Sequence, residues 1–143
     1  MNNFSLRRPV NLSIFSVLLF SAFFLVAIGA PQESVKHVTA KQARTLLDKD
    51  TTVVVLDVRT AEEFKSQTGH LPRAINIPVQ ELEQRWRELE KFRSREILVY
   101  CRSGNRSMRA NGILQNKKFK LLHMDGGILQ WNAESPPPAK EKK

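Results

Sequence analysis

The stretch that decides the fold is ILVYCRSGNRS, residues 97–107. It begins with four apolar residues, as a buried strand does, and continues as a polar segment. Residues 107–115 then predict a helix. A strand followed by a short polar loop and a helix is the repeating unit of α/β domains, and a loop at the carboxyl end of such a strand lies at the ligand-binding edge of the sheet.

The same alternation of short apolar runs and helical segments extends outward from residue 35. Residues 52–58 (TVVVLDV) predict a strand buried on both faces. Further strands are expected near residue 35 and at residues 74–77 and 119–123. Five strands interleaved with helices predict an α/β domain in which a five-stranded parallel sheet carries helices on both faces.

Helices are predicted between these strands from their starts and their apolar faces. Thr39 with Gln42, and Thr60 with Glu63, are capping-box patterns, and the first of these helices should extend to about residue 47. Residues 80–92 predict another helix, whose apolar face carries Leu82, Trp86, Leu89 and Phe92.

The length and composition of the chain allow one domain of modest size. The chain has 143 residues, a net charge of +9 and one cysteine, which excludes a multi-domain enzyme, a polytopic membrane protein and a disulfide-stapled miniprotein. The basic residues are spread along the chain without an accompanying aromatic stripe, so no nucleic acid partner is expected.

The N-terminal residues differ in composition from the rest. Arg7 and Arg8 precede the uncharged run VNLSIFSVLLFSAFFLVAI, residues 10–28. Residues 1–29 are predicted to be either a signal peptide cleaved after Gly29 or an N-terminal anchor associated with the membrane through residues 10–28. Both alternatives place the domain of residues 33–134 outside the cytoplasm, in the periplasm if the source is bacterial. Residues 135–143 predict a disordered basic tail.

Reactive chemistry is expected at Cys101. The backbone N–H groups of its loop can point inward, and the N-terminus of the following helix adds positive potential. Together with Arg102 and Arg106 these groups should stabilise the thiolate and lower the pKa of Cys101. A buried structural cysteine would rarely be followed by so polar a run. The sequence therefore predicts a nucleophile for a small anionic substrate.

Four segments in order resemble the rhodanese-like sulfurtransferases. They are LDVR with EEF behind it (residues 56–59 and 62–64), GHLP through AINIP (69–72 and 74–78), the loop at residues 101–107, and Gly126–Gly127 with Trp131. Arg73 departs from the family pattern, which has glycine there, and is expected to alter the local backbone.

The resemblance implies a persulfide carrier at Cys101 that needs no cofactor. The donor, thiosulfate or a persulfide, would be held by the loop, and the acceptor would be cyanide or a thiol; the donor-binding residues would be Arg102, Ser103, Gly104, Asn105, Arg106 and Ser107. Related phosphatases use a loop one residue longer, Cys-x5-Arg, so the shorter loop favours sulfur transfer. The alternative is a non-catalytic rhodanese-like module that binds a partner or senses redox state.

Weaker candidates lie outside the loop. Asp57 and Arg59 lie where the run of residues 52–58 ends. They are expected to support the site, Asp57 by accepting hydrogen bonds and Arg59 by pairing with a carboxylate such as Glu63. His70 is expected to stabilise its loop. The three histidines, His37, His70 and His123, share no ligand spacing along the chain, so no metal site is predicted.

Overall fold

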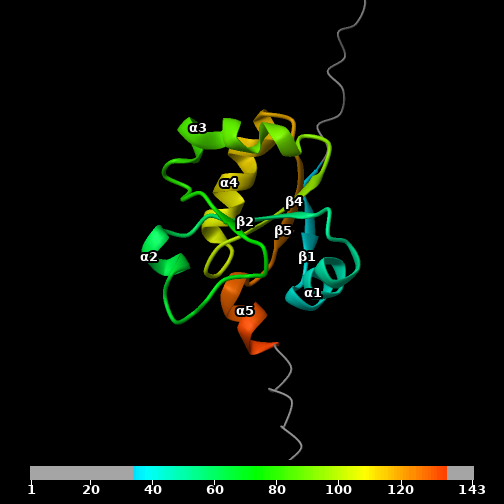
Figure 1. Cartoon of the computed structure of the whole chain (residues 1–143), viewed down its shortest axis with the longest axis vertical. Helices are drawn as coiled ribbons and strands as arrows, with labels where there is room; N and C mark the ends of the chain where they lie inside the picture. Colours follow the sequence, from blue (N-terminus) through cyan, green and yellow to red (C-terminus); the bar gives the residue numbers. More distant parts are fainter. Residues whose placement is uncertain (1–33, 135–143) are drawn as a thin grey trace, which may run out of the picture. The chain divides into compact units, whose positions relative to one another are not determined.

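The structure is a computed structural model that describes residues 34–134 (Figure 1). The predicted signal peptide or anchor of residues 1–29 and the predicted tail of residues 135–143 lie outside the described residues. Within residues 34–134, no helix is long and apolar enough to cross a bilayer.

Five strands alternate with helices along the described chain, as the sequence predicts. The strands are β1 (Lys36–Val38), β2 (Val54–Asp57), β3 (Ile75–Asn76), β4 (Glu96–Tyr100) and β5 (Lys120–Met124). The helices are α1 (Ala40–Lys49), α2 (Ala61–Phe64), α3 (Leu82–Arg85), the 3-10 helix η1 (Trp86–Phe92), α4 (Asn105–Asn116) and α5 (Gly127–Ala133).

All five strands form one parallel sheet in the order β1-β5-β4-β2-β3. Because the strands are parallel, their carboxyl ends share one edge, and the loops that follow β2, β4 and β5 meet there. The predicted fold class, an α/β domain with a five-stranded parallel sheet, is confirmed.

Helices cover both faces of the sheet, and each face has its own apolar core. Alternate residues of β4 divide between them: Ile97 and Val99 pack with residues of α3, η1 and α4, whereas Leu98 and Tyr100 pack with residues of α1 and α5. This alternation follows from the two-residue period of a strand. It explains why residues 53–58 are apolar almost without interruption, since both faces are buried.

Capping boxes mark the starts of two helices, α1 and α2, whereas the helix predicted at residues 80–92 takes a different form. Both predicted capping boxes are present, at Thr39 before α1 and at Thr60 before α2. The single helix predicted at residues 80–92 is instead α3 followed by η1. Its apolar side chains Trp86, Leu89 and Phe92 recur every three residues, which matches the three residues per turn of a 3-10 helix. They still pack on the core, as predicted.

Candidate active site

Cys101 lies at the carboxyl end of β4, in the loop that leads into α4, and its side chain is buried. The N–H of Gly104 donates to its Sγ at 3.1 Å, and the hydroxyl of Ser107 approaches Sγ at 3.6 Å. The backbone N–H groups of Ser103 and Ser107 also interact with Sγ. The loop is therefore a ring of donors around one sulfur atom.

The balance of these interactions favours the thiolate. Burial alone would raise the pKa of Cys101, but the hydrogen bonds from the Ser107 hydroxyl and from the backbone of Ser107, Gly104 and Ser103 outweigh it and lower the pKa. The predicted direction is confirmed. The leading stabilising groups are dipoles of the loop itself rather than the two arginine charges.

Helix α5 holds the loop in this conformation from behind. The N–H of Ile128 donates to the carbonyl of Cys101 at 2.8 Å, and the N–H of Leu129 donates to the carbonyl of Arg102 at 3.2 Å. Gly127, at φ +57°, is close enough that a Cβ would overlap the Cys101 carbonyl oxygen and lie 2.6 Å from that of Arg102. With its carbonyls bound to α5, the loop can direct its N–H groups at the sulfur.

Gly104 supplies the turn that begins α4. Its φ of +115° lies in the region that side chains rarely adopt, which explains a glycine here. Its carbonyl accepts from the hydroxyl of Ser107 at 2.8 Å. The Ser107 hydroxyl has one hydrogen, so it can serve this carbonyl or the Cys101 sulfur at a given moment.

Arg106 lies at the rim of the loop and is held by Glu63 of α2. Its guanidinium donates two hydrogen bonds to the Glu63 carboxylate, at 2.5 and 2.7 Å. The hydrogen bonds from Arg106 outweigh burial and lower the pKa of Glu63 to about 2. The charge of Cys101 contributes to the raised pKa of Arg106, after that of Glu63. Glu63 therefore neutralises much of the Arg106 charge that the sequence predicted would stabilise the Cys101 thiolate.

The remaining loop residues are exposed. Arg102, Ser103 and Asn105 all lie on the surface. Arg102 also lines a cavity of about 330 Å³, together with Arg59, Glu62, Glu63, Ser66 and Thr68. The loop therefore has a buried interior around Sγ and an exposed rim beside a cavity that both arginines and glutamates line.

Asp57 and Arg59 form a buried ion pair next to this cavity. The Arg59 guanidinium donates to the Asp57 carboxylate at 2.6 to 3.0 Å and to the carbonyl of Gly69 at 2.7 Å. The prediction that Arg59 pairs with a carboxylate is confirmed, but the suggested partner Glu63 is wrong, since Glu63 binds Arg106. Asp57 accepts hydrogen bonds as predicted, and Arg59 ties β2 to the loop at Gly69.

His70 lies in that same loop. Its Nδ1 is 3.0 Å from the carbonyl oxygen of Leu71, and its ring stacks on Phe64 at a centroid distance of 4.2 Å. These contacts fit the predicted stabilising role.

Two contributions to the site have no counterpart in the sequence-based predictions. The sequence predicts Glu63 as part of a helix cap, which it forms, but Glu63 also holds Arg106. In the sequence, Gly127 is noted only as part of a segment that resembles the family, whereas its contact with the Cys101 carbonyl depends on how α5 packs. Neither contact has a signal along the sequence, because each joins elements more than twenty residues apart.

Comparisons with known proteins identify the family of the chain. The rhodanese-like domain family model matches residues 39–134. The chain is 28% identical to the candidate sulfurtransferase YtwF of Bacillus subtilis, covering 72% of this chain and 96% of that protein. It is 33% identical to a sulfurtransferase of Allochromatium vinosum, covering 59% and 77%.

A solved structure gives the same result for the fold. The rhodanese-related protein of Thermoplasma volcanium superposes with a TM-score of 0.63 at 31% identity, over 71% of this chain and 95% of that one. The family model, the relatives and the cysteine loop at the sheet edge all lead to one conclusion: the chain belongs to the rhodanese-like domain family of sulfurtransferases.

Proposed function

We propose that the protein transfers sulfane sulfur from thiosulfate, or from a persulfide, to cyanide or a thiol through a persulfide on Cys101. The observation that carries this proposal is the convergence of backbone N–H groups and the Ser107 hydroxyl on the Cys101 sulfur, with its lowered pKa. The names of relatives support the reaction class. The choice of thiosulfate rests on the charge and size of the loop.

In the first half-reaction the Cys101 thiolate attacks the outer sulfur of thiosulfate. A new S–S bond forms at Cys101, the S–S bond of thiosulfate breaks, and sulfite leaves with the electron pair. Arg102 at the rim and the N–H groups that the loop directs at Sγ favour a small dianion and its anionic leaving group. Basic loop residues favour such a donor over a carbonyl-bearing thiol such as mercaptopyruvate.

In the second half-reaction the acceptor attacks the terminal sulfur of the persulfide. With cyanide, a carbon–sulfur bond forms, thiocyanate leaves, and the electron pair of the broken S–S bond returns to the Cys101 thiolate. The donors that stabilise the thiolate, the N–H groups of Ser103, Gly104 and Ser107, then hold the regenerated anion. No metal or organic cofactor is needed to balance either step.

The short loop also supports sulfur transfer over phosphate chemistry. Four residues separate Cys101 from Arg106, one fewer than in the phosphatase loop. The ring of donors closes around one sulfur atom, with Gly104 N–H only 3.1 Å from Sγ. A tetrahedral oxyanion needs a wider ring.

The place of action follows from residues 10–28, outside the described part of the chain. We propose that this apolar run exports the domain, or anchors it, so that sulfur transfer takes place outside the cytoplasm.

The proposal is tested by thiocyanate formation from thiosulfate and cyanide, with the purified chain and its Cys101→Ser variant. We expect turnover by the wild type and a loss of at least about 1,000-fold in the variant, because a serine hydroxyl is not ionised at neutral pH. Mercaptopyruvate is the matched alternative donor and should be used less well. A folded wild type inactive with every donor would favour a binding or redox-sensing module, and activity in Cys101→Ser would contradict the mechanism.

A further inference from the structure

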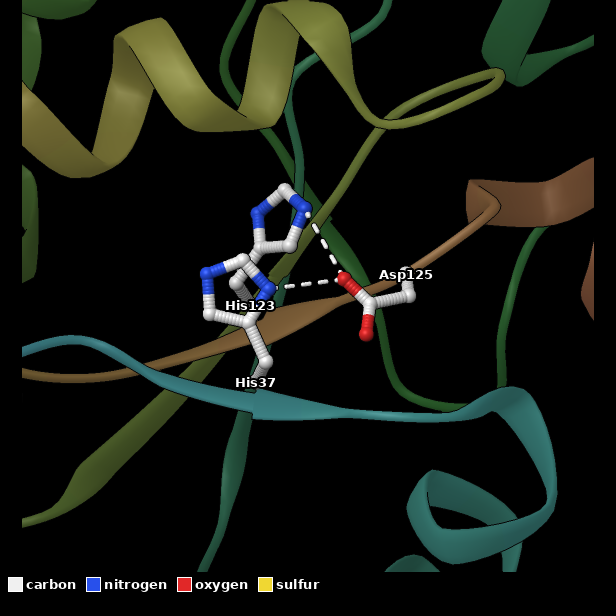
Figure 2. Close-up of side chains that lie close together, drawn as sticks. All are labelled: His37, His123 and Asp125. Atoms are coloured by element: carbon white, nitrogen blue, oxygen red, sulfur yellow. Dashed lines mark hydrogen bonds and ion pairs between the residues drawn. The ribbon is translucent and has the colours of Figure 1, made fainter.

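Three side chains that the proposed reaction does not use gather at the edge of the sheet, on β1 and at the end of β5. They are His37, His123 and Asp125, and Figure 2 shows both imidazole rings directed at the same carboxylate oxygen of Asp125. His37 Nδ1 lies 2.8 Å from Asp125 Oδ1, and His123 Nε2 lies 3.7 Å from the same atom. The three ligand atoms all lie within 4.8 Å of one another.

The sheet register assembles this group. His37 and His123 are direct neighbours in the parallel pairing of β1 with β5, so their side chains share one face. Asp125 follows His123 by two residues, which keeps it on that face, and its N–H donates to the carbonyl of Val38 at 2.9 Å. Spacing along the chain gives no sign of the group, because His37 comes from a different strand.

The donor set is that of a transition-metal site. Imidazole nitrogens suit Zn²⁺, Co²⁺, Ni²⁺ and Cu²⁺, and two imidazoles with one carboxylate leave a position open for water. Ligand atoms about 2.0–2.1 Å from a tetrahedral ion lie about 3.3 Å apart. Two of the three separations, 2.8 and 3.7 Å, bracket that value, and the third is at most 4.8 Å.

The three side chains differ in how freely they can move to bind an ion. His123 is 3% exposed and fixed, whereas His37 and Asp125 are each about half exposed. The two exposed side chains can therefore close on an ion that rests on the fixed one. Solvent reaches the group from their side, which gives an ion a path of entry.

Asn111 of α4 can orient the buried ligand. Its Nδ2 lies 3.0 Å from His123 Nδ1, and its Oδ1 is buried without a hydrogen-bond partner. A half-turn of this amide would let Oδ1 accept a hydrogen bond from Nδ1–H, and that tautomer leaves the lone pair of His123 Nε2 free for a metal ion. Metal-binding histidines commonly donate their second N–H in this way.

We propose that His37, His123 and Asp125 form a binding site for a first-row divalent metal ion, with Zn²⁺ the best fit. The proposed sulfur transfer needs no metal, although the site adjoins the cysteine loop: a Cβ on Gly104 would lie 3.7 Å from His123 Nε2. The site departs from the sequence-based expectation of no metal site, which considered only spacing along the chain.

The test is a Zn²⁺ titration of the purified, tag-free chain by calorimetry, with a Co²⁺ titration followed by visible absorption. Both use a Cys101→Ser background, because a reactive thiolate is a competing ligand. We expect one ion per chain and a tetrahedral Co²⁺ spectrum. His37→Ala and Asp125→Asn, both exposed and safe for folding, should weaken binding at least about 100-fold, since even an outer partner contributes about 10- to 100-fold.

His70→Ala is the matched control, because it removes a histidine outside the group and should leave the affinity unchanged. Zn²⁺ should also raise the Tm of the Cys101→Ser protein but not that of its His37→Ala derivative. The proposal is overturned if the parent binds neither ion, or if His37→Ala and Asp125→Asn bind as tightly as His70→Ala.

Discussion

The interior and the rim of the cysteine loop differ in how they act on the sulfur. In the interior, the N–H of Gly104 and the hydroxyl of Ser107 are held close to Cys101 Sγ, in a buried space. At the rim, Arg102 is exposed to solvent and Arg106 is bound to Glu63. Fixed dipoles in a buried space stabilise the thiolate strongly, because no water weakens their field. The effect of an arginine charge on the sulfur is weaker when solvent screens it or a carboxylate neutralises it.

The difference assigns separate tasks to the two regions. We expect the interior to set the reactivity of the thiol and the rim to set the affinity for an anionic donor. Changes that reach the interior should therefore have larger effects than changes at the rim.

Among substitutions that keep Cys101, the largest effect is expected from Gly127→Ala, which disturbs the interior from behind. A Cβ at φ +57° would overlap the Cys101 carbonyl and displace the loop. We expect a loss of about 2–3 kcal/mol in the free energy of unfolding. Sulfur-transfer activity should fall at least about 100-fold, since a small misplacement at a reacting centre has that consequence. Urea unfolding and the thiocyanate assay measure both.

Gly112→Ala is the matched control for that substitution. Gly112 lies in α4, where an added Cβ would meet no atom within 4 Å, and its φ is not positive. Alanine there should stabilise the helix by about 0.5–1 kcal/mol and leave turnover unchanged. Equal effects of the two substitutions would remove the special role assigned to Gly127.

The second-largest effect is expected from Ser107→Ala, which removes one hydrogen-bond donor from the interior. Without the hydroxyl the pKa of Cys101 should rise, so less thiolate is present at neutral pH. The rate of alkylation by iodoacetamide at pH 7 should fall about 10-fold, as expected for a hydrogen bond to a charged group. The pH profile of alkylation should shift upward, and at high pH the two rates should converge.

Ser94→Ala removes an exposed hydroxyl just before β4, at the opposite end of that strand from the loop, and serves as the control. An unchanged alkylation profile for Ser107→Ala would mean that its hydroxyl stays on the Gly104 carbonyl and contributes nothing to the thiolate.

The smallest effect is expected from Arg106→Ala at the rim. The KM for thiosulfate should rise about 3- to 5-fold, because a partly exposed arginine that is already paired with Glu63 contributes up to about 1 kcal/mol to binding an anion. Alkylation by neutral iodoacetamide should change less than about twofold, since the interior donors remain. Arg109→Ala, an exposed arginine of the same helix, controls for charge alone. If Arg106→Ala lost more thiol reactivity than Ser107→Ala, the rim rather than the interior would set the reactivity of Cys101, contrary to this account.

The sequence predicts the parts of the site that are continuous along the chain. Residues 97–107 predict a strand, the loop and Cys101 as nucleophile, because one local run encodes all three. The capping boxes at Thr39 and Thr60 are equally local and are present. Arg73, singled out as a departure from the family pattern, has a φ of +59°, in the region that favours glycine.

Features that depend on register or packing could not be predicted in this way. The choice of Asp57 rather than Glu63 as the partner of Arg59 depends on the position of α2 relative to β2. The contact of Gly127 with the Cys101 carbonyl depends on α5 packing. The group of His37, His123 and Asp125 requires knowing that β1 pairs with β5.

The most direct test of the central claim is the intact mass of the purified chain before and after thiosulfate, and again after cyanide. Cys101→Ala, treated in parallel, is the control. We predict that the wild type alone gains one sulfur atom and loses it to cyanide as thiocyanate. A folded, reduced wild type that gains no sulfur from thiosulfate, or a Cys101→Ala variant that does gain it, would contradict the account.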